Sequence, residues 1–141
     1  MPATVEQLAQ VPLFRDVPFK ALQRLARISR DRTFSDGEAI VSEGDEGVGF
    51  YLIHSGNVDV TRGGSSLTTL GPNDYFGEMA LLDNHRRSAT VTARGPVQTF
   101  AMLRSDFIAE VESSPDLAIH LLAGLSRRLR ETDARLAAHE R

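Results

Sequence analysis

The residues best suited to chemistry lie in segment 76–91, which reads Phe-Gly-Glu-Met-Ala-Leu-Leu-Asp-Asn-His-Arg-Arg-Ser-Ala-Thr-Val. Gly77 permits a tight turn there, because it has no Cβ to clash at positive φ. Residues 78–82 are then expected to form one or two turns of helix, with the acidic Glu78 where the helix dipole favours it. A short break leads into residues 88–92, whose small and β-branched side chains predict a strand.

This segment gathers donors and acceptors that suit a nucleotide. Arg87 offers a planar guanidinium fork, and a helix start offers unpaired backbone N–H groups, and both fit an anionic phosphate. Glu78 is a pure acceptor, so it should bind a pair of hydroxyl groups and not the anion. Phosphate and ribose hydroxyl recognition side by side suggests a nucleotide with one phosphate. The ordinary alternatives are a helix-end acid for Glu78 and a weak surface ion pair for Arg87.

The segment resembles the phosphate-binding cassette of cyclic nucleotide-binding domains, whose pattern is Phe-Gly-Glu-x-Ala-Leu, a few loop residues, then Arg-Ser/Ala-Ala-Thr. Every anchor of that pattern is present, namely Phe76, Gly77, Glu78, Ala80, Leu81, Arg87, Ser88, Ala89 and Thr90. By this resemblance, Glu78 holds the ribose 2′-hydroxyl and Arg87 pairs with the cyclic phosphate. The ligand contacts that it implies in the cassette are Phe76, Gly77, Glu78, Met79, Ala80, Arg87, Ser88 and Ala89.

The composition is that of an ordinary globular chain. With 141 residues, 41% of them hydrophobic and 25% charged, a single domain with a proper core is expected. The formal net charge of −3 gives no support to a strongly nucleic-acid-binding surface. The chain has no cysteine, which excludes disulfides, thiolate metal sites and cysteine nucleophiles. No apolar run approaches the ~20 residues that span a bilayer, and no signal-peptide pattern is present, so a cytoplasmic location is expected.

The single domain, 1–141, divides into three parts. Residues 1–31 are expected to be helical, with Thr4 capping a first helix and Asp16 acting as the N-cap of a second. Residues 32–104 consist of short strand candidates separated by turn clusters rich in Gly, Asn and Pro, which favours a sandwich or small barrel of about eight strands. The glycine spacing of this part also resembles the jelly-roll-like β-roll (double-stranded β-helix) of the family.

The third part, 105–141, is expected to hold a short hinge helix and a long lid helix from Pro115 to about residue 139. An a/d stripe runs along the long helix, formed by Leu122, Leu125, Leu129, Thr132 and Leu136. The spacing leaves two explanations open, a dimer seam or a face that packs on the chain's own roll. In regulators like the catabolite activator protein the equivalent helix dimerises and also reaches the base, and this resemblance places Thr132 and Asp133 at the base-contacting positions.

Other chemistries find little support. The four histidines, His54, His85, His120 and His139, show no metal-ligand spacing, and no nucleophile motif is present. We therefore expect no catalytic residues, no metal and no cofactor, which disfavours a cupin-like metal enzyme.

The sequence thus predicts an α+β fold, in which an antiparallel β-roll is flanked by N-terminal helices and a long C-terminal helix. The predicted function is that of a cyclic nucleotide sensor that signals by repositioning its last helix and is not an enzyme. Serine at position 88 resembles cAMP-binding members and favours cAMP over cGMP, whereas Asp133 could accept from a guanine amino group.

The alternative is an interaction or dimerisation module that keeps the fold without binding nucleotide. The expected partner is a second copy of the chain or a downstream effector protein. Direct DNA binding is not expected, because the helix-turn-helix of the family's regulators does not follow the long helix.

Overall fold

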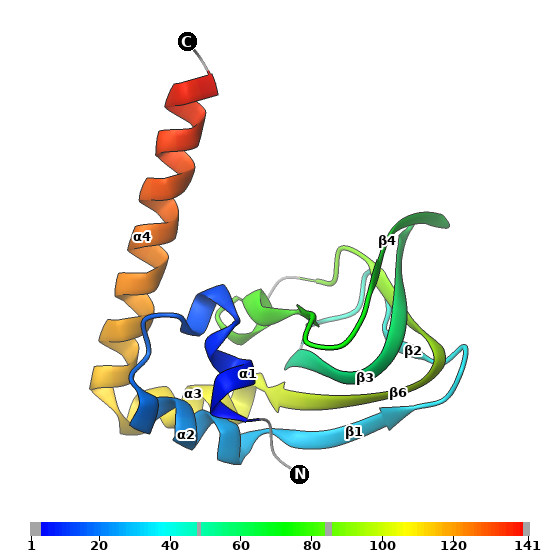
Figure 1. Ribbon diagram of the computed structural model, residues 1–141, viewed down its shortest axis with the longest axis horizontal. Helices are drawn as coiled ribbons and strands as arrows, with labels where there is room; N and C mark the ends of the chain where they lie inside the picture. Colours follow the sequence, from blue (N-terminus) through cyan, green and yellow to red (C-terminus); the bar gives the residue numbers. More distant parts are fainter. Residues whose placement is uncertain (1–3, 48, 84–85, 140–141) are drawn as a thin grey trace.

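The chain folds into an antiparallel sheet with helices at one end, as the computed structural model shows for residues 4–47, 49–83 and 86–139 (Figure 1). The N-terminal helical elements are α1 (Val5–Ala9), the 3₁₀ turn η1 (Pro12–Phe14) and α2 (Phe19–Ile28). The C-terminal ones are α3 (Arg104–Ser113) and the long α4 (Pro115–His139). The predicted α+β fold class is therefore confirmed.

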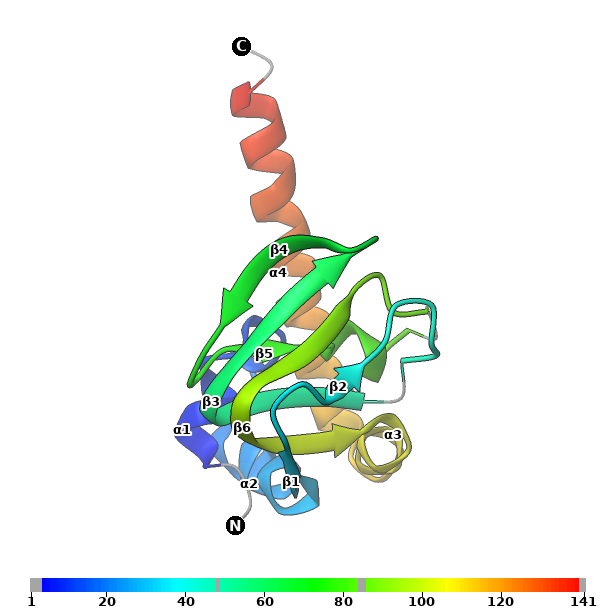
Figure 2. The same cartoon turned by 90° about the vertical axis from the view of Figure 1, so that its right-hand side faces the viewer.

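The described residues form one sheet of six strands, all paired antiparallel, with β1, β6, β3 and β4 side by side, β2 on β6 and β5 on β3 (Figure 2). Their bounds are β1 Arg30–Phe34, β2 Ala39–Val41, β3 Gly49–Arg62, β4 Ser65–Leu70, β5 Tyr75–Phe76 and β6 Thr90–Leu103. The 3₁₀ turn η2 (Glu78–Leu81) lies between β5 and β6.

The prediction of about eight strands was wrong, because β3 and β6 each run through a glycine that was taken as a turn or break. One of the turn clusters expected from the sequence, Ser55-Gly56-Asn57, is an irregularity inside β3, where the pairing with β6 shifts register. Gly56 has φ +91°, and a Cβ there would lie 2.3 Å from the carbonyl oxygen of Pro96. Gly95 has φ +76° within β6. These glycines let two long strands bend without ending, which curves the sheet.

Two apolar clusters hold the fold together. The first lies between the helices and the sheet, and its centre is Phe14, with ring centroids 5.9 Å from Phe50 and 6.3 Å from Phe107. The second lies inside the curve of the sheet and consists of Phe34, Ile53, Val58, Val91, Ala93 and Val97. The helices therefore cover one end of the roll, and the second cluster is built from side chains of the strands themselves.

The start of α2 differs from the prediction. Thr4 does cap α1, since its side chain accepts from the Gln7 amide in a capping box. Asp16, however, is not the N-cap of α2; that position is Pro18, without a side-chain cap. The Asp16 carboxylate instead accepts from the Arg127 guanidinium of α4, with a distance of 2.9 Å. A contact across the fold has taken the place of a local cap.

Helix α4 packs on the domain only through its first half. Leu117 and Leu121 are buried in the first cluster, and Leu125 packs against it partly buried. The outward face carries Ile119, Leu122, Leu129 and Leu136, each between 57% and 65% exposed. The distal half of α4 stands away from the rest of the domain (Figure 1). Of the leucines in the a/d stripe, only Leu125 packs on the chain's own domain, so this packing does not explain the apolar residues at the other stripe positions.

Replacing Phe14 by alanine should destabilise the domain strongly. The side chain is fully buried between two aromatic rings, and its loss would leave a cavity that costs about 3–5 kcal/mol in the free energy of unfolding. Phe19→Ala is the matched control, because Phe19 is 60% exposed and its loss should change that free energy by less than about 0.5 kcal/mol. Urea unfolding followed by circular dichroism measures both, and equal losses would contradict the proposed core.

Candidate functional site

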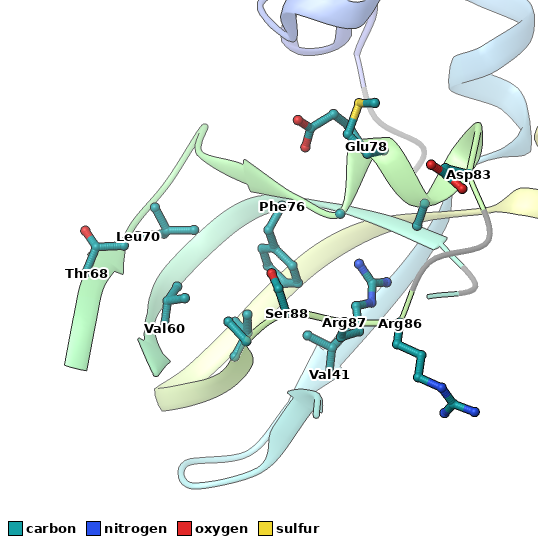
Figure 3. Close-up of a pocket in the computed structure, with 15 residues that line it drawn as sticks. Val41, Val60, Thr68, Leu70, Phe76, Glu78, Asp83, Arg86, Arg87 and Ser88 are labelled. Atoms are coloured by element: carbon teal, nitrogen blue, oxygen red, sulfur yellow. The ribbon is translucent and has the colours of Figure 1, made fainter. Parts of the chain in front are cut away.

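A cavity of about 640 Å³ opens between the curved strands and η2 (Figure 3). Its apolar side is lined by Val41, Val60, Leu70 and Val91. The remaining lining residues are Thr68, Phe76, Gly77, Glu78, Met79, Ala80, Asp83, Arg86, Arg87, Ser88 and Ala89. This size falls within the range of about 300–1,000 Å³ that small-molecule sites occupy, and one apolar side with a few polar groups is typical of them.

The turn that carries Glu78 is shorter than expected. η2 is a single 3₁₀ turn whose N-cap is Gly77, with φ +80°. The Ala80 amide donates to the Gly77 carbonyl at 3.0 Å, so this N–H group is already used within the turn and is not one of the unpaired donors expected at a helix start. Ala80 and Leu81 are buried and anchor the turn, while Glu78 is half-buried and Met79 is exposed at the cavity.

Arg87 is a partly buried cation at the wall of this cavity. Its guanidinium NH2 donates to the carbonyl oxygen of Gly49 on β3, and its Nε is buried without a hydrogen-bond partner. Burial lowers the pKa of Arg87 from its ordinary value, and the nearby Tyr51 opposes that effect. No ion pair to a carboxylate is found for Arg87 within the described part of the chain. An under-bonded, partly desolvated cation beside a cavity is suited to an incoming anion.

The backbone fixes where Arg87 points. Its amide donates to the Asp45 carbonyl at 2.7 Å, and its own carbonyl accepts from the Gly44 amide at 2.9 Å. The neighbouring Arg86 is exposed, donates to the Gly44 carbonyl at 2.8 Å and points away from Arg87 (Figure 3). Consecutive residues of an extended segment face opposite ways, so only Arg87 is presented to the centre of the site.

Gly77 leaves room for the Arg87 side chain. A Cβ at position 77 would lie 2.3 Å from the Arg87 NH1 atom and 2.8 Å from the Gly49 carbonyl oxygen. The positive φ of Gly77 would also strain any other residue. The glycine of the sequence pattern is therefore needed for two reasons, the turn and the guanidinium beside it.

Glu78 and Arg87 do not neutralise each other. No ion pair between them occurs among the described residues, and in Figure 3 the carboxylate and the guanidinium point apart. The charge of Glu78 instead acts on Tyr75 of β5, whose pKa is raised first by burial and then by this carboxylate. The acid therefore remains available as an acceptor.

Ser88 lies just before the last strand and lines the cavity. Its carbonyl accepts from the Arg62 Nε at 2.9 Å, which ties it to β3. The strand expected from residue 88 begins at Thr90 instead, whose hydroxyl accepts from the Glu43 amide at 2.9 Å. The Ser88 side chain is thus outside the sheet ladder and exposed at the cavity.

The described residues include no cluster of three or more histidine and acidic side chains that could hold a metal ion. His85, one of the candidates considered above, lies outside the described ranges. Over those same ranges, none of the helices has the length and apolarity to cross a membrane.

Residues 31–114 match the family model described as "Cyclic nucleotide-binding domain". The chain belongs to this family. The matched range contains the whole cassette and every strand except the first residue of β1.

Relatives of known description agree with this assignment. The chain is 37% identical to the "Cyclic AMP receptor protein" of Thermus thermophilus over 130 residues, 89% of this chain and 60% of the relative. It is 33% identical over 124 residues to a "cGMP-dependent protein kinase" of Eimeria tenella, covering 88% of this chain and 12% of the kinase. The chain thus spans at most about three fifths of these curated relatives.

A solved structure shows the same architecture over nearly its whole length. The N-terminal domain of a transcriptional regulator from Streptomyces coelicolor A3(2) superposes with a TM-score of 0.82 at 29% identity, covering 92% of this chain and 93% of that one.

Within this cyclic nucleotide-binding fold, the structure brings eight of the ten proposed ligand-binding residues around one cavity, namely Phe76, Gly77, Glu78, Met79, Ala80, Arg87, Ser88 and Ala89. Thr132 and Asp133 do not line it. Both are exposed on the distal half of α4, where the Thr132 hydroxyl donates to the Arg128 carbonyl at 2.9 Å.

The sequence reasoning missed the other wall of the cavity, formed by Val41, Val60, Thr68, Leu70 and Val91. Val58 and Val60 are two positions apart, as are Thr68 and Leu70, and this spacing predicts that each pair lies on one face of its strand. It did not tell which face would line a cavity, because that depends on how the sheet curves.

Gly77→Ala should disturb Arg87, and Gly37→Ala is its matched control. Both glycines have φ +80°, but a Cβ at position 37 would meet nothing within 4 Å. We expect Gly37→Ala to lower the free energy of unfolding by about 1 kcal/mol through backbone strain, and Gly77→Ala to cost at least about 1 kcal/mol more through the clash. Equal losses in urea unfolding would show that Gly77 serves only the turn.

Proposed function

We propose that this domain is a sensor that binds a cyclic nucleotide, cAMP in preference to cGMP, and catalyses no reaction. The observation that carries the proposal is Arg87, a partly buried guanidinium with no carboxylate partner among the described residues, at the wall of a cavity of nucleotide size. A cyclic phosphate would supply the missing negative charge, in a site where the guanidinium has already lost part of its water.

The remaining groups suit the rest of the ligand. Glu78, half-buried and not paired with Arg87, would accept hydrogen bonds from the ribose 2′-hydroxyl. The Ser88 hydroxyl would donate to a phosphate oxygen. The base would lie over Val60, Leu70 and Val91, where apolar side chains can cover its faces.

The preference for cAMP rests on Ser88, because this sequence resembles cAMP-binding members of the family at that position. Asp133, which could accept from a guanine amino group, lies outside the cavity together with Thr132 and would approach the base only when Thr132 does. Of the two relatives described above, one is named for cAMP and one for cGMP, so their names do not decide the preference.

The signal would be a shift in the position of α4. Phosphate capture by Arg87 would draw the cassette inward, and Leu81, Leu82 and α4 would then move to cover the base through Thr132. A ligand shifts such an equilibrium only by binding one position more tightly than the other. The receiver would be a second copy of the chain, docked along α4, or an effector protein.

Calorimetric titration with cAMP and with cGMP tests the binding. Wild-type protein should bind cAMP more tightly, and Arg87→Ala should lose at least about 30-fold in affinity because a charge-assisted phosphate contact disappears. Arg86→Ala is the matched control, since its side chain points away from the centre of the site, and should bind nearly as well as wild type.

Absence of heat and of thermal stabilisation with either nucleotide at millimolar concentration would contradict the proposal. The chain would then be better described as an interaction module that has kept the fold. Tighter binding of cGMP would retain the sensor and overturn the assigned preference.

The outward stripe of α4 should hold two copies together. Leu129→Glu would place a charge in a seam of exposed leucines and should convert a dimer into a monomer in sedimentation equilibrium. Ala134→Glu adds the same charge to another face of α4, also exposed, and should leave the dimer intact. A wild-type protein that stays monomeric at every concentration measured would favour an effector as the partner.

A further inference from the structure

One ion pair joins helix α4 to the N-terminal segment, in addition to the packing of Leu117 and Leu121 on the core. Arg127 NH1 donates to Asp16 Oδ1 at 2.9 Å, and the two side chains are 29% and 32% exposed. Asp16 lies in the short connection between η1 and α2, so the pair links this connection to the middle of the last helix. Within the described part of the chain, no other ion pair is found between α4 and another element.

Gly124 brings the two elements into close contact at the same place. A Cβ at this position would lie 3.3 Å from Asp16 Oδ2 and 3.8 Å from the Leu13 carbonyl oxygen. Glycine inside a helix costs about 0.5–1 kcal/mol relative to alanine, so its presence needs a structural reason. The close approach of α4 to the carboxylate supplies that reason.

The ion pair is incompletely satisfied. Arg127 NH2 and Nε are buried without a hydrogen-bond partner, and the nearest further carboxylate oxygen, Glu131 Oε1, is 3.8 Å from Nε. A guanidinium that loses water without filling its donors gains little from its partner. The contact is therefore specific in geometry and weak in energy, which suits a contact that has to open.

The ion pair lies where it can control the distal half of α4. Leu117, Leu121 and Leu125 pack on the core, Arg127 binds Asp16, and residues 131–138 are all exposed. Thr132 and Asp133 are therefore held outside the cavity just one turn beyond the pair. On the same side of the fold, Arg128 and Arg15 act electrostatically on Tyr75, the residue before Phe76 of the cassette.

We propose that Asp16 is a positioning residue for the nucleotide response: through Arg127 it holds α4 away from the cavity, and nucleotide binding has to open this pair. The proposal rests on the sensor function proposed above. Asp16 touches no ligand in this account. Its effect is to add stability to the position of α4 in which the base is uncovered, and any such addition weakens nucleotide binding by the same factor.

Affinity is the first test. Asp16→Asn and Arg127→Gln should each tighten cAMP binding in calorimetry by about two- to five-fold, the range that a partly exposed ion pair allows. The double variant should bind no more tightly than either single one, because both remove the same contact. Asp59→Asn is the matched control, since it removes the 3.5 Å pair with Arg94 inside the sheet, and it should leave the affinity unchanged.

The position of α4 is the second test, and it needs no nucleotide. The chain has no native cysteine, so spin labels can be placed at Ser66→Cys on β4 and Ala134→Cys on α4, both exposed. Double electron–electron resonance measures the distance between the two labels, with labelled protein diluted in unlabelled protein. In the protein that carries only the two labelled cysteines, the distance distribution should have a single peak. Adding Asp16→Asn should add a second population, and adding Asp59→Asn should not.

The outcomes separate this proposal from the one on which it rests. An unchanged distance distribution in the Asp16→Asn protein overturns the positioning role, and so does an affinity that is unchanged or weakened. If wild-type protein binds neither nucleotide, the sensor function fails. A second population of label distances in the Asp16→Asn protein would then still support the proposal that Asp16 fixes the position of α4.

Discussion

The site depends on one constraint: a guanidinium is held partly out of water without a carboxylate partner. Arg87 donates to the Gly49 carbonyl, and no ion pair neutralises it within the described residues. Gly77 is required because any side chain there would strike the guanidinium. Such an arrangement lowers stability unless an anion completes it, which is why we place the phosphate of the ligand there.

The elements around Arg87 form a frame and a long helix that packs on this frame only in part. The long paired strands β3 and β6, bent at Gly56 and Gly95, hold the wall of the cavity, and the cluster around Phe14 fixes the helices against one end. Helix α4 packs on this frame through its first half only, and its distal half carries exposed leucines. In the proposed function, a ligand that binds the frame acts on α4 without altering the sheet.

The residues of the cassette could be predicted from the sequence because they lie close together along the chain. Residue types indicated phosphate and ribose recognition, the resemblance to the family's cassette supplied the full set of ligand contacts, and eight of these residues do surround one cavity. Long-range pairing was not predictable. Gly56 reads as a turn in sequence, yet the pairing of β3 with β6 carries the strand through it. Asp16 reads as a cap, yet Arg127, 111 positions away, takes its carboxylate. The apolar wall likewise depends on sheet curvature, which no short pattern encodes.

The most direct measurement is the side-chain ¹⁵N–¹H NMR spectrum of Arg87, assigned by its loss in Arg87→Lys, during addition of cAMP. Its Nε–H is buried without a partner, so its resonance should be observable and should move as the phosphate arrives. The account predicts a saturable shift of this signal with cAMP and a weaker response with cGMP. A signal that stays in place while either nucleotide is present in large excess would contradict the claim that Arg87 is the phosphate anchor.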